Sequence, residues 1–512
     1  MTHTFYITTA IDYSNGEPHL GHAYEKLGAD CVARYRRLRG DRVHFVMGMD
    51  EHGQKVAQSA DEAGVDRTQW VNQIAAQFAS AWSALSISHD DFIRTTEPRH
   101  RRAVEALLRR MQKAGYISQG TYAGYYCVGC EAFKLEKDLD GNGRCPLHPT
   151  REIKWVEEEN YFFRIGAFRQ RLLDHYAAHP DFVRPASKLN EVRNIVEEWT
   201  DDQKLSVTRA RLPWGIPWPD DPNHTVYVWI EALMNYLSAA GFPDPCYEEL
   251  WPADVHVIGP DIVRFHAAFW PAMLMAAGLA LPRLVWCHGW INLEGARFSK
   301  SAGVRVTLDE IVARHGPDAL RYFVLREVPW HGDGSFTWER FDARYTSDLA
   351  DGYGNLVSRV LSMILRYLDG TVPPAGNTTP LDRACDETVA RYGEAMDAHL
   401  LHEGAAAAWQ LVARANAYVE EAAPWALAKQ GDTTGLGTVL AALWRGVTRI
   451  SLMASPFLPN KTQITWEALG HPGSITDARW PALEHPPAPA RTVQKPPPLF
   501  PKAGSGRWEV TV

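Results

Sequence analysis

Short apolar runs alternate with longer amphipathic segments through the first third of the chain. Residues 4–11 and 43–47 are apolar runs of strand length, whereas residues 20–38 place their apolar side chains on one face of a helix. The same helical spacing continues to about residue 64 and recurs over residues 66–85. Strands that alternate with helices predict a parallel sheet covered on both faces.

A stretch rich in Tyr, Gly and Cys interrupts this alternation, which then resumes. Residues 225–230, 254–258 and 284–288 predict strands, and residues 231–240 and 261–277 predict the helices between them. The interrupting stretch is therefore interpreted as an insertion between two halves of one α/β sheet.

The last third of the chain has a helical pattern. Apolar side chains recur with 3.6-residue spacing over residues 341–368, 400–422 and 437–453, which predicts a helical bundle. The end of the chain is rich in proline, and we expect it to wrap the surface rather than form a domain.

Composition narrows the class of protein. A chain of 512 residues is too long for one core, so two to four domains are expected. The 53 Lys and Arg against 61 Asp and Glu give a net charge of −8, so a nucleic-acid partner would need a local basic surface. The start resembles no secretory leader, no apolar stretch has membrane-spanning length, and seven cysteines make no disulfide framework. We expect a cytoplasmic protein without membrane contact.

The first predicted strand leads into Tyr13-Ser-Asn-Gly-Glu-Pro-His-Leu-Gly-His22, directly before a predicted helix. Gly21 would let a planar ligand or phosphate approach the backbone, and His19 and His22 could donate to phosphate oxygens beside the helix N-terminus. The alternative is an ordinary helix start with two solvated histidines. The position after the first strand of an α/β domain favours a ligand site.

A second motif, Ala296-Arg-Phe-Ser-Lys-Ser-Ala-Gly303, places Lys300 between two serines in a loop. A flexible lysine beside hydroxyls suits the charge that develops on a pyrophosphate, and a loop can close over it. Taken alone, such a loop is more often a surface turn. Together the two motifs resemble the paired signatures of class I aminoacyl-tRNA synthetases.

Three further motifs extend the resemblance, over nearly the whole chain, to methionyl-tRNA synthetases. They are Gly48-Met-Asp-Glu-His-Gly53, Tyr227-Val-Trp-Ile-Glu-Ala-Leu-Met-Asn-Tyr236 and Gly259-Pro-Asp-Ile-Val-Arg-Phe-His266. The resemblance implies that Asp50 binds the α-ammonium of the substrate. The implied methionine site is Ile11, Tyr13, Asp50, Trp229, Ala232, Leu233, Tyr236 and His266. The implied ATP site is His19, Gly21, His22, Asp261, Arg297, Ser299, Lys300 and Ser301, with His19, His22 and Lys300 catalytic.

The implied methionine site agrees with the chemistry of a thioether, which is apolar, polarisable and favoured against aromatic rings. Two tyrosines, a tryptophan and a histidine could surround the sulfur and exclude shorter side chains. Each aromatic residue taken singly is more often ordinary core packing, so only the set together with Asp50 favours a binding site.

Three positions depart from the usual sequence of this family. Arg297 and Phe298 stand where the family usually has Lys and Met, and Pro260 stands where it usually has Lys. Lys300 is present and Arg297 keeps the positive charge, so we expect an active enzyme with altered ATP kinetics.

The middle insertion contains two pairs of candidate metal ligands, Cys127-Val-Gly-Cys130 and Cys145-Pro-Leu-His148. Each pair has two intervening residues, the spacing of a tetrahedral Cys₃His zinc knuckle, and a redox Cys-x-x-Cys would leave the second pair unexplained. Four protein ligands predict a structural Zn²⁺, and the methionyl enzymes with zinc knuckles carry theirs in this insertion.

The helical region contains two motifs that resemble the family's anticodon-reading residues. Gly354-Asn-Leu-Val-Ser-Arg359 places Asn355 and Arg359 one turn apart, and Ala423-Pro-Trp425 places a tryptophan at a helix start. A tryptophan there could stack on an unpaired base. The alternative is a core tryptophan and a salt bridge on a helix surface.

The resemblance implies a class of fold: a Rossmann-type α/β sheet, split by a zinc-binding connective insertion and followed by an α-helical anticodon-binding bundle. The implied boundaries are 1–115 and 216–290 for the two catalytic halves, 116–215 for the insertion, 291–345 for the mobile signature loop and stem-contact region, 346–480 for the bundle and 481–512 for the tail. The insertion is much smaller than the editing domains of the Ile, Leu and Val enzymes. No oligonucleotide-fold domain follows the bundle, which favours a monomer.

The function implied by the resemblance is ATP-dependent attachment of L-methionine to tRNA(Met) through methionyl-adenylate, with Mg²⁺ accompanying ATP. One alternative is a duplicated paralogue, either an inhibitor-resistant copy or an amide-forming ligase of secondary metabolism. Another is a tRNA-binding protein without catalysis. His19, His22, Asp50 and Lys300 argue against the last, and Asn355, Arg359 and Trp425 argue against loss of tRNA use.

Overall fold

The computed structural model describes residues 4–127, 132–134, 136, 139–146, 153–210, 212, 214–293, 296–297, 306–374, 378–488 and 491–502.

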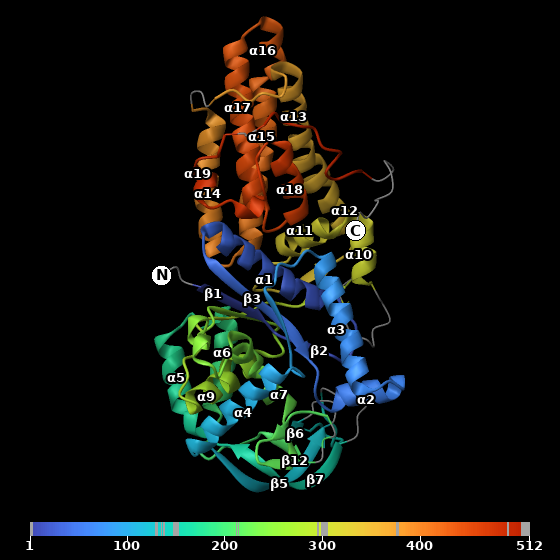
Figure 1. Cartoon of the computed structure of the whole chain (residues 1–512), viewed down its shortest axis with the longest axis vertical. Helices are drawn as coiled ribbons and strands as arrows, with labels where there is room; N and C mark the ends of the chain where they lie inside the picture. Colours follow the sequence, from blue (N-terminus) through green and yellow to red (C-terminus); the bar gives the residue numbers. More distant parts are fainter. Residues whose placement is uncertain are drawn as a thin grey trace.

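A parallel sheet of seven strands forms the centre of the N-terminal half (Figure 1). The strands follow the order β2-β3-β1-β13-β14-β8, and β4 also pairs with β3. They are β1 (Thr4–Thr9), β2 (Asp12–Tyr13), β3 (Arg42–Asp50), β4 (Asp91–Arg94), β8 (Val183–Arg184), β13 (Val255–Ile258) and β14 (Val285–Cys287). The prediction of one parallel sheet interrupted by a long middle segment is confirmed. β8 lies within residues 116–215, so the segment expected as an insertion also contributes an edge strand.

Helices cover both faces of this sheet, as the alternation along β1 shows. Phe5 and Ile7 belong to one hydrophobic core, and Tyr6 between them belongs to a second. The helices of the α/β part are α1 (Leu20–Arg39), α2 (Gln54–Ala63), α3 (Arg67–Ala84), α4 (Pro98–Lys113), α5 (Arg169–Ala178), α6 (Ala186–Glu197), α7 (Val228–Leu233), α8 (Asn235–Ala240) and α9 (Trp270–Ala276). Side chains two apart on a strand share a face, so the two cores lie on opposite faces of the sheet.

The strand predicted at residues 225–230 is wrong in its second half and in its sheet. β12 (Asp221–Val226) ends before this apolar run does, and α7 begins at Val228. β12 pairs antiparallel with β10 (Thr208–Ala210) and β11 (Pro217–Trp218), outside the parallel sheet. A short, continuous apolar run fits a buried helix as well as a buried strand, so periodicity alone could not separate the two.

The middle of the chain builds a long antiparallel hairpin at the end of the molecule away from the helical region (Figure 1). β5 (Ile117–Cys127) and β7 (Ile153–Phe163) form it, with β6 (Ala132–Lys134) and β9 (Leu205–Ser206) on its two sides. A small sheet of β15 (Ile291–Leu293), β16 (Ala296–Arg297) and β17 (Gly334–Phe336) follows the catalytic half.

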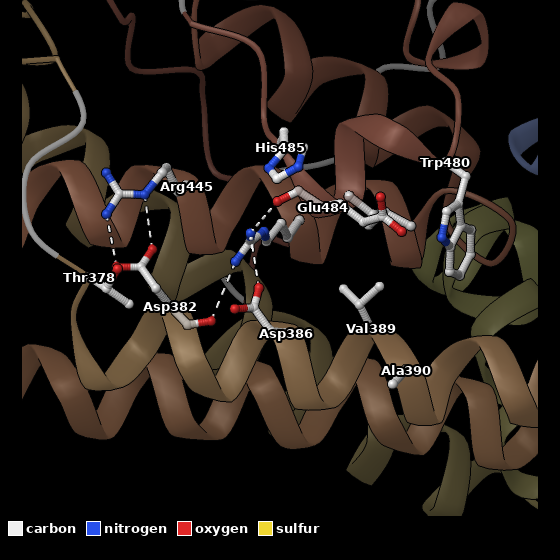
Figure 2. A pocket seen from close by; sticks show the side chains of 11 residues that line it. Thr378, Asp382, Asp386, Val389, Ala390, Arg445, Trp480, Glu484 and His485 are labelled. Carbon is white, nitrogen blue, oxygen red and sulfur yellow. Dashed lines mark hydrogen bonds and ion pairs between the residues drawn. The ribbon is translucent and has the colours of Figure 1, made fainter.

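The C-terminal half is helical, as the spacing predicts. Its helices are α10 (Leu308–His315), α11 (Pro317–Glu327), α12 (Trp338–Arg344), α13 (Asn355–Leu368), α14 (Pro380–Asp397), α15 (Leu401–Ala422), α16 (Pro424–Gln430), α17 (Thr433–Ala454), α18 (Pro459–Ala468) and α19 (Pro481–Glu484). Residues of α14, α17 and α19 line a pocket of about 580 Å³, in which Arg445 donates two hydrogen bonds of 2.9 Å to Asp382 (Figure 2).

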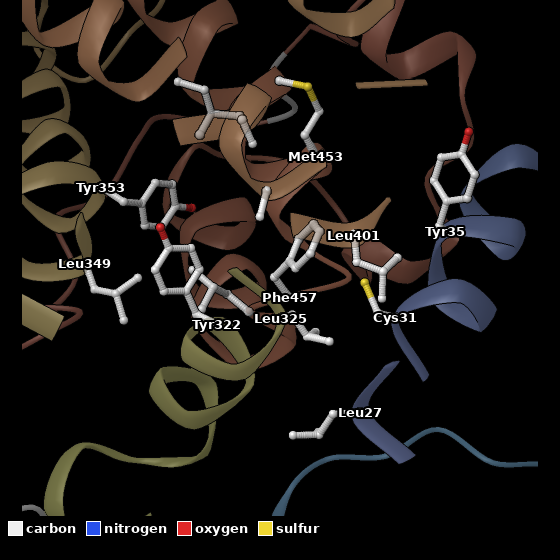
Figure 3. Close-up of a cluster of buried hydrophobic side chains, with 14 of the residues drawn as sticks. Leu27, Cys31, Tyr35, Tyr322, Leu325, Leu349, Tyr353, Leu401, Met453 and Phe457 are labelled. Atoms are coloured by element: carbon white, nitrogen blue, oxygen red, sulfur yellow. The ribbon is translucent and has the colours of Figure 1, made fainter. Parts of the chain in front are cut away.

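The helical region and the sheet share one hydrophobic core. Side chains of α1, α11 and α17 lie in the same buried cluster, among them Leu27, Leu325 and Met453 (Figure 3). Arg321 of α11 crosses this junction and lies 2.6 Å from Asp30 of α1, with both side chains fully buried. The bundle is therefore packed firmly onto the catalytic half rather than joined by a free linker.

The helices of the described residues include none with both the length and the hydropathy needed to cross a membrane.

Candidate functional site

His19 and His22 begin helix α1 and cap each other. The backbone N–H of Gly21 donates to Nδ1 of His19 at 3.1 Å, and the backbone N–H of His19 donates to Nδ1 of His22 at 3.3 Å. The two rings stack with their centroids 3.7 Å apart. A Cβ at Gly21 would lie 3.0 Å from the His19 ring, so the arrangement favours glycine. Because both Nδ1 atoms accept, each neutral ring carries its proton on Nε2, from which it can donate to a phosphate oxygen.

Two adjoining pockets lie at the carboxyl ends of β1, β3 and β13. One of about 420 Å³ is lined by His19, Gly21, His22 and Asp261, and also by Tyr13. The other, of about 50 Å³, is lined by Ala232, Leu233, Tyr236 and His266. Ile11, Asp50 and Trp229 line both. Every predicted methionine or ATP residue whose side chain is described therefore lines one of these two pockets.

The smaller pocket has an aromatic wall. The Trp229 ring stacks on the Phe265 ring, with the ring centroids 4.9 Å apart and an angle of 13° between the planes. The ring centroids of Tyr13 and Trp229 are 6.3 Å apart. Phe265 and Ile262 also line the pocket, although neither is among the predicted site residues. Both stand within the block from Gly259 to His266, so that motif was the signal that could have identified them.

Tyr236 and His266 form a neutral hydrogen-bonded pair at the smaller pocket. Nδ1 of His266 lies 3.0 Å from the Ile262 carbonyl, which can only accept, so the ring proton is on Nδ1. Nε2 of His266 therefore accepts from the Tyr236 hydroxyl at 2.6 Å. Burial lowers the pKa of His266 to about 4, so this ring is uncharged at neutral pH. An uncharged pair suits an apolar ligand side chain.

Asp50 is buried where the two pockets meet. It is the last residue of β3, and the register of β2 on β3 places it opposite Tyr13. Its backbone carbonyl accepts from the backbone N–H of Ser14 at 2.9 Å. A carboxylate here, close to an apolar pocket, could hold the ammonium group of an amino acid.

Several predicted residues lie outside the described residues. Phe298, Ser299, Lys300 and Ser301 do, and so do the predicted metal ligands Cys130 and His148. Arg297 ends β16, whose backbone pairs with β15.

The two predicted zinc ligands that are described, Cys127 and Cys145, are both fully buried. Neither of the two hydrophobic cores formed by the described residues includes them. Among these same residues, no group of three His, Cys, Asp or Glu side chains is arranged to hold a metal ion. The zinc prediction therefore stays a prediction, since half of its donor set is not described.

The predicted anticodon residues lie on two helices of the bundle, α13 and α16. Asn355 is exposed at the start of α13, and Arg359 on the same helix lies 2.5 Å from Glu420 of α15. Trp425 is the second residue of α16, and 43% of its side chain is exposed. The alternative of a core tryptophan is wrong for Trp425, whereas the salt bridge that the same alternative expected is present at Arg359.

Comparison with known proteins decides the family. The family described as tRNA synthetases class I (M) matches residues 5–152 and 142–361, and the anticodon-binding domain of tRNA ligase matches residues 381–495. A methionine–tRNA ligase of Rhizobium meliloti is 44% identical over 467 residues, which are 90% of this chain and 90% of that protein. The chain belongs to the methionine–tRNA ligase family. The family member of Thermotoga maritima is 42% identical over 468 residues, 90% of this chain and 74% of that protein.

Solved structures of this family share the whole fold. Methionyl-tRNA synthetase of Mycobacterium tuberculosis in complex with methionyl-adenylate superimposes with a TM-score of 0.92 at 38% identity, over 98% of this chain and all of that one. The free-state structure from the same organism gives 0.85 at 35% identity, over 99% of both chains. The chain thus has a class I synthetase fold with a helical C-terminal anticodon-binding domain.

A buried cluster of charges in the wall of the larger pocket is not among the predicted site residues. Nζ of Lys26 lies 2.7 Å from Asp12 and 2.8 Å from Glu25, and it donates to the Ala10 carbonyl at 3.0 Å. His288 approaches the other oxygen of Glu25 at 3.3 Å. Asp12 and Lys26 stand fourteen positions apart on different elements, so only the fold brings them together.

The charges of this cluster are tuned by burial and by Lys26. Burial raises the pKa of Asp12 to about 7, against the opposing effect of Lys26. Burial alone would raise the pKa of Glu25, but Lys26 and His288 lower it overall. Glu25, Lys26 and Asp12 all line the larger pocket, so its wall carries negative and positive groups in fixed places.

Proposed function

We propose that this chain activates L-methionine with ATP and attaches it to tRNA(Met), as the family name describes for its relatives. The observation that supports this most strongly is the pair of adjoining pockets with Asp50 where they meet. An aromatic pocket for a thioether and a histidine-lined pocket for a triphosphate would bring the carboxylate of methionine to the α-phosphorus of ATP.

The first step joins methionine to AMP. A carboxylate oxygen of methionine attacks the α-phosphorus, and the bond from that phosphorus to the pyrophosphate oxygen breaks. Methionyl-adenylate and pyrophosphate result, and no protein nucleophile is needed. Catalysis is then a matter of positioning and of charge stabilisation in the transition state.

The protein's own groups would meet the phosphate charge. His19 and His22 donate through Nε2 to phosphate oxygens, and the N-terminus of α1 adds a partial positive charge. Lys300 neutralises the leaving pyrophosphate. Mg²⁺ bound with ATP would supply further positive charge to the phosphates. Ile11, Tyr13 and Trp229 orient the amino acid while Asp50 holds its ammonium group.

The second step charges the tRNA. A hydroxyl of the terminal adenosine, the 2′-hydroxyl in the first transfer of class I enzymes, attacks the carbonyl carbon of the adenylate, and AMP leaves. Asn355, Arg359 and Trp425 would read the anticodon at the far end of the molecule. Arg359 must exchange Glu420 for a base or phosphate when the tRNA binds.

Charging of tRNA(Met) with labelled methionine tests this function. A methionine–tRNA ligase forms methionyl-tRNA(Met) in an ATP-dependent reaction, and an inhibitor-resistant copy does the same. An amide-forming ligase would form the adenylate but leave the tRNA uncharged, and a tRNA-binding protein without catalysis would do neither.

Residues 1–115 and 216–290 would form the catalytic domain, residues 116–215 the connective insertion and residues 291–345 the mobile loop and stem-contact region. Residues 346–480 would form the anticodon-binding domain, with residues 481–512 as its tail. We place the enzyme in the cytoplasm, where protein synthesis takes place, and as a monomer, because the two pockets of one chain would accommodate both small substrates.

A structural Zn²⁺ would be held by Cys127, Cys130, Cys145 and His148. Cys145 is buried although the residues on both sides of it are exposed, and it takes no part in either hydrophobic core of the described residues. A thiol buried outside an apolar core is what a metal ligand requires, and the thiolate and imidazole set suits Zn²⁺. Bound there, the ion would hold together a segment whose described residues from 118 to 160 belong to neither hydrophobic core.

Removal of one zinc ligand should release the metal. Native mass spectrometry should find one zinc per chain, and Cys145→Ala should lose it and loosen residues 120–160 in hydrogen exchange, with a partial loss of activity. Cys246→Ala is the matched control, since Cys246 is an exposed thiol elsewhere. A metal-free protein with full activity would remove the zinc proposal.

Trp425→Ala should separate the two steps. Methionine-dependent pyrophosphate exchange needs no tRNA and should be unchanged. In contrast, kcat/KM for tRNA(Met) should fall, by an amount that corresponds to about 1–3 kcal/mol of activation free energy for the loss of one stacked base. Trp155→Ala removes another exposed tryptophan, 61% exposed on β7, and should leave both reactions unchanged. Loss of neither reaction in Trp425→Ala would show that the bundle does not read the anticodon through this residue.

A further inference from the structure

A buried charged pair lies behind the smaller pocket and lines neither of the two pockets. Glu231 stands in α7 between Trp229 and Ala232, and its side chain is fully buried. Its Oε1 lies 2.7 Å from Nδ1 of His52, two residues beyond Asp50. The pair therefore joins the helix that forms the aromatic wall to the strand end that carries Asp50.

Trp214 holds the loop of His52 in place. Its indole N–H donates to the Glu51 carbonyl at 2.5 Å, and its own carbonyl accepts from the Gly53 backbone at 3.3 Å. Its ring meets His52 edge-on, with centroids 5.7 Å apart. Because Trp214 contacts the backbone of the residues on both sides of His52, the His52 ring is held in place beside Glu231.

The second oxygen of Glu231 faces His100 of α4. Oε2 lies 4.0 Å from Nε2 of His100, and neither atom has a hydrogen-bond partner among the described residues. The Ser238 hydroxyl donates to the Met234 carbonyl at 2.9 Å, so it accepts from Nδ1 of His100 at 2.9 Å. The neutral His100 ring thus carries no proton toward Glu231, and His52 is the partner of the glutamate.

We propose that Glu231 and His52 are a positioning pair that fixes the distance between Asp50 and the aromatic wall. The inference rests on the proposed function, in which Asp50 binds the ammonium group and Trp229 lines the side-chain pocket. An amino acid is then selected by one preassembled unit, because its ammonium group and its side chain must fit at a set separation. Small errors in such a separation are costly, since a misplacement of about 1 Å can cost about 10²-fold in rate.

The charges on this pair make the arrangement depend on pH. Burial alone would lower the pKa of His52, but the charge of Glu231, aided by Glu51, raises it above the ordinary value. Burial raises the pKa of Glu231, while His52 opposes that effect. His100, also near Arg99, stays neutral because burial lowers its pKa to about 3.

The sign of the pH effect follows from the raised pKa of His52. Below its ordinary pKa the ring is protonated and the ion pair with Glu231 is intact. As pH rises through the raised pKa, His52 loses its proton and the pair loses its attraction. The KM for methionine should therefore rise over that pH range, and this rise should be absent in a variant without the Glu231 charge, which has no ion pair to lose.

The test is the steady-state kinetics of pyrophosphate exchange by the full chain with Glu231→Gln, which keeps the shape and removes the charge. We expect the KM for methionine to rise about tenfold or more while the KM for ATP stays within about twofold. His52→Asn should give the same selective rise, and it carries the test if Glu231→Gln does not fold. Asp382→Asn, which breaks a charged pair in the bundle, should lower Tm and leave the KM for methionine unchanged.

Two results would overturn the positioning role. One is an unchanged KM for methionine with an unchanged pH profile in both variants. The other is a joint loss of both KM values and kcat with a lower Tm, which would make the pair a general element of stability. A wild-type chain without methionine-dependent exchange would instead refute the proposed function on which the inference rests.

Discussion

Asp50→Asn is expected to lower kcat/KM for methionine by about 10²–10³-fold. The substitution removes the negative partner of the substrate ammonium group in a buried position, where Asp50 lies only 6% exposed. Leaving one charge of a buried pair without its partner costs about 3–5 kcal/mol. Pyrophosphate exchange measured over a range of methionine concentrations checks the result.

The loss should be confined to methionine. The KM for ATP should change much less, because His19, His22 and Asp261, which line the larger pocket together with Asp50, would still meet the nucleotide. Asp61→Asn is the matched control, since Asp61 pairs with Arg67 on the surface and is 61% exposed there. Equal losses for methionine and ATP would show that Asp50 shapes the site rather than binds the ammonium group.

Lys300→Ala should lower the rate of adenylate formation by at least about 10²-fold, the scale expected for one preorganised donor to a developing charge. The lysine acts on the leaving pyrophosphate, so methionine binding without ATP should be nearly unchanged. Single-turnover formation of methionyl-adenylate measures this step directly. Equilibrium binding of methionine in the absence of ATP measures whether the affinity for the amino acid is unchanged.

Two further variants sharpen the test of Lys300. Lys300→Arg keeps the charge and should recover part of the rate, whereas Lys113→Ala, at the exposed end of α4, should have no effect. A normal rate of adenylate formation in Lys300→Ala would place the stabilisation of pyrophosphate elsewhere, with Arg297 the next residue to test.

Local patterns predicted the main elements of the fold well where one signal dominated. The helix expected at residues 20–38 is α1, because an apolar stripe, a capping histidine and Gly40 in the left-handed conformation all agree. The edge strand β8, with only two paired residues, left no periodicity to detect. The prediction of a strand over residues 225–230 was wrong for the opposite reason. The apolar run from Val226 to Ile230 contains both the end of a strand and the start of a buried helix, and both are apolar.

The sequence predicted those residues of the candidate site that stand in recognisable motifs. His19, Asp50 and Trp229 stand in recognisable blocks, and they line the same adjoining pockets. The pairs Lys26–Asp12 and Glu231–His52 could not be predicted, because each joins residues of two elements that only the tertiary fold brings within 3 Å. Motifs identify the groups that would touch a ligand, whereas the buried charges that hold those groups become visible only in the structure.

Exchange of labelled pyrophosphate into ATP, measured without tRNA and with each standard amino acid in turn as the substrate, tests the central claim most directly. The two pockets and Asp50 predict strong exchange with L-methionine and little with leucine, isoleucine or valine, which lack the long thioether. A folded chain that shows no exchange with methionine, or equal exchange with these branched amino acids, would contradict the account.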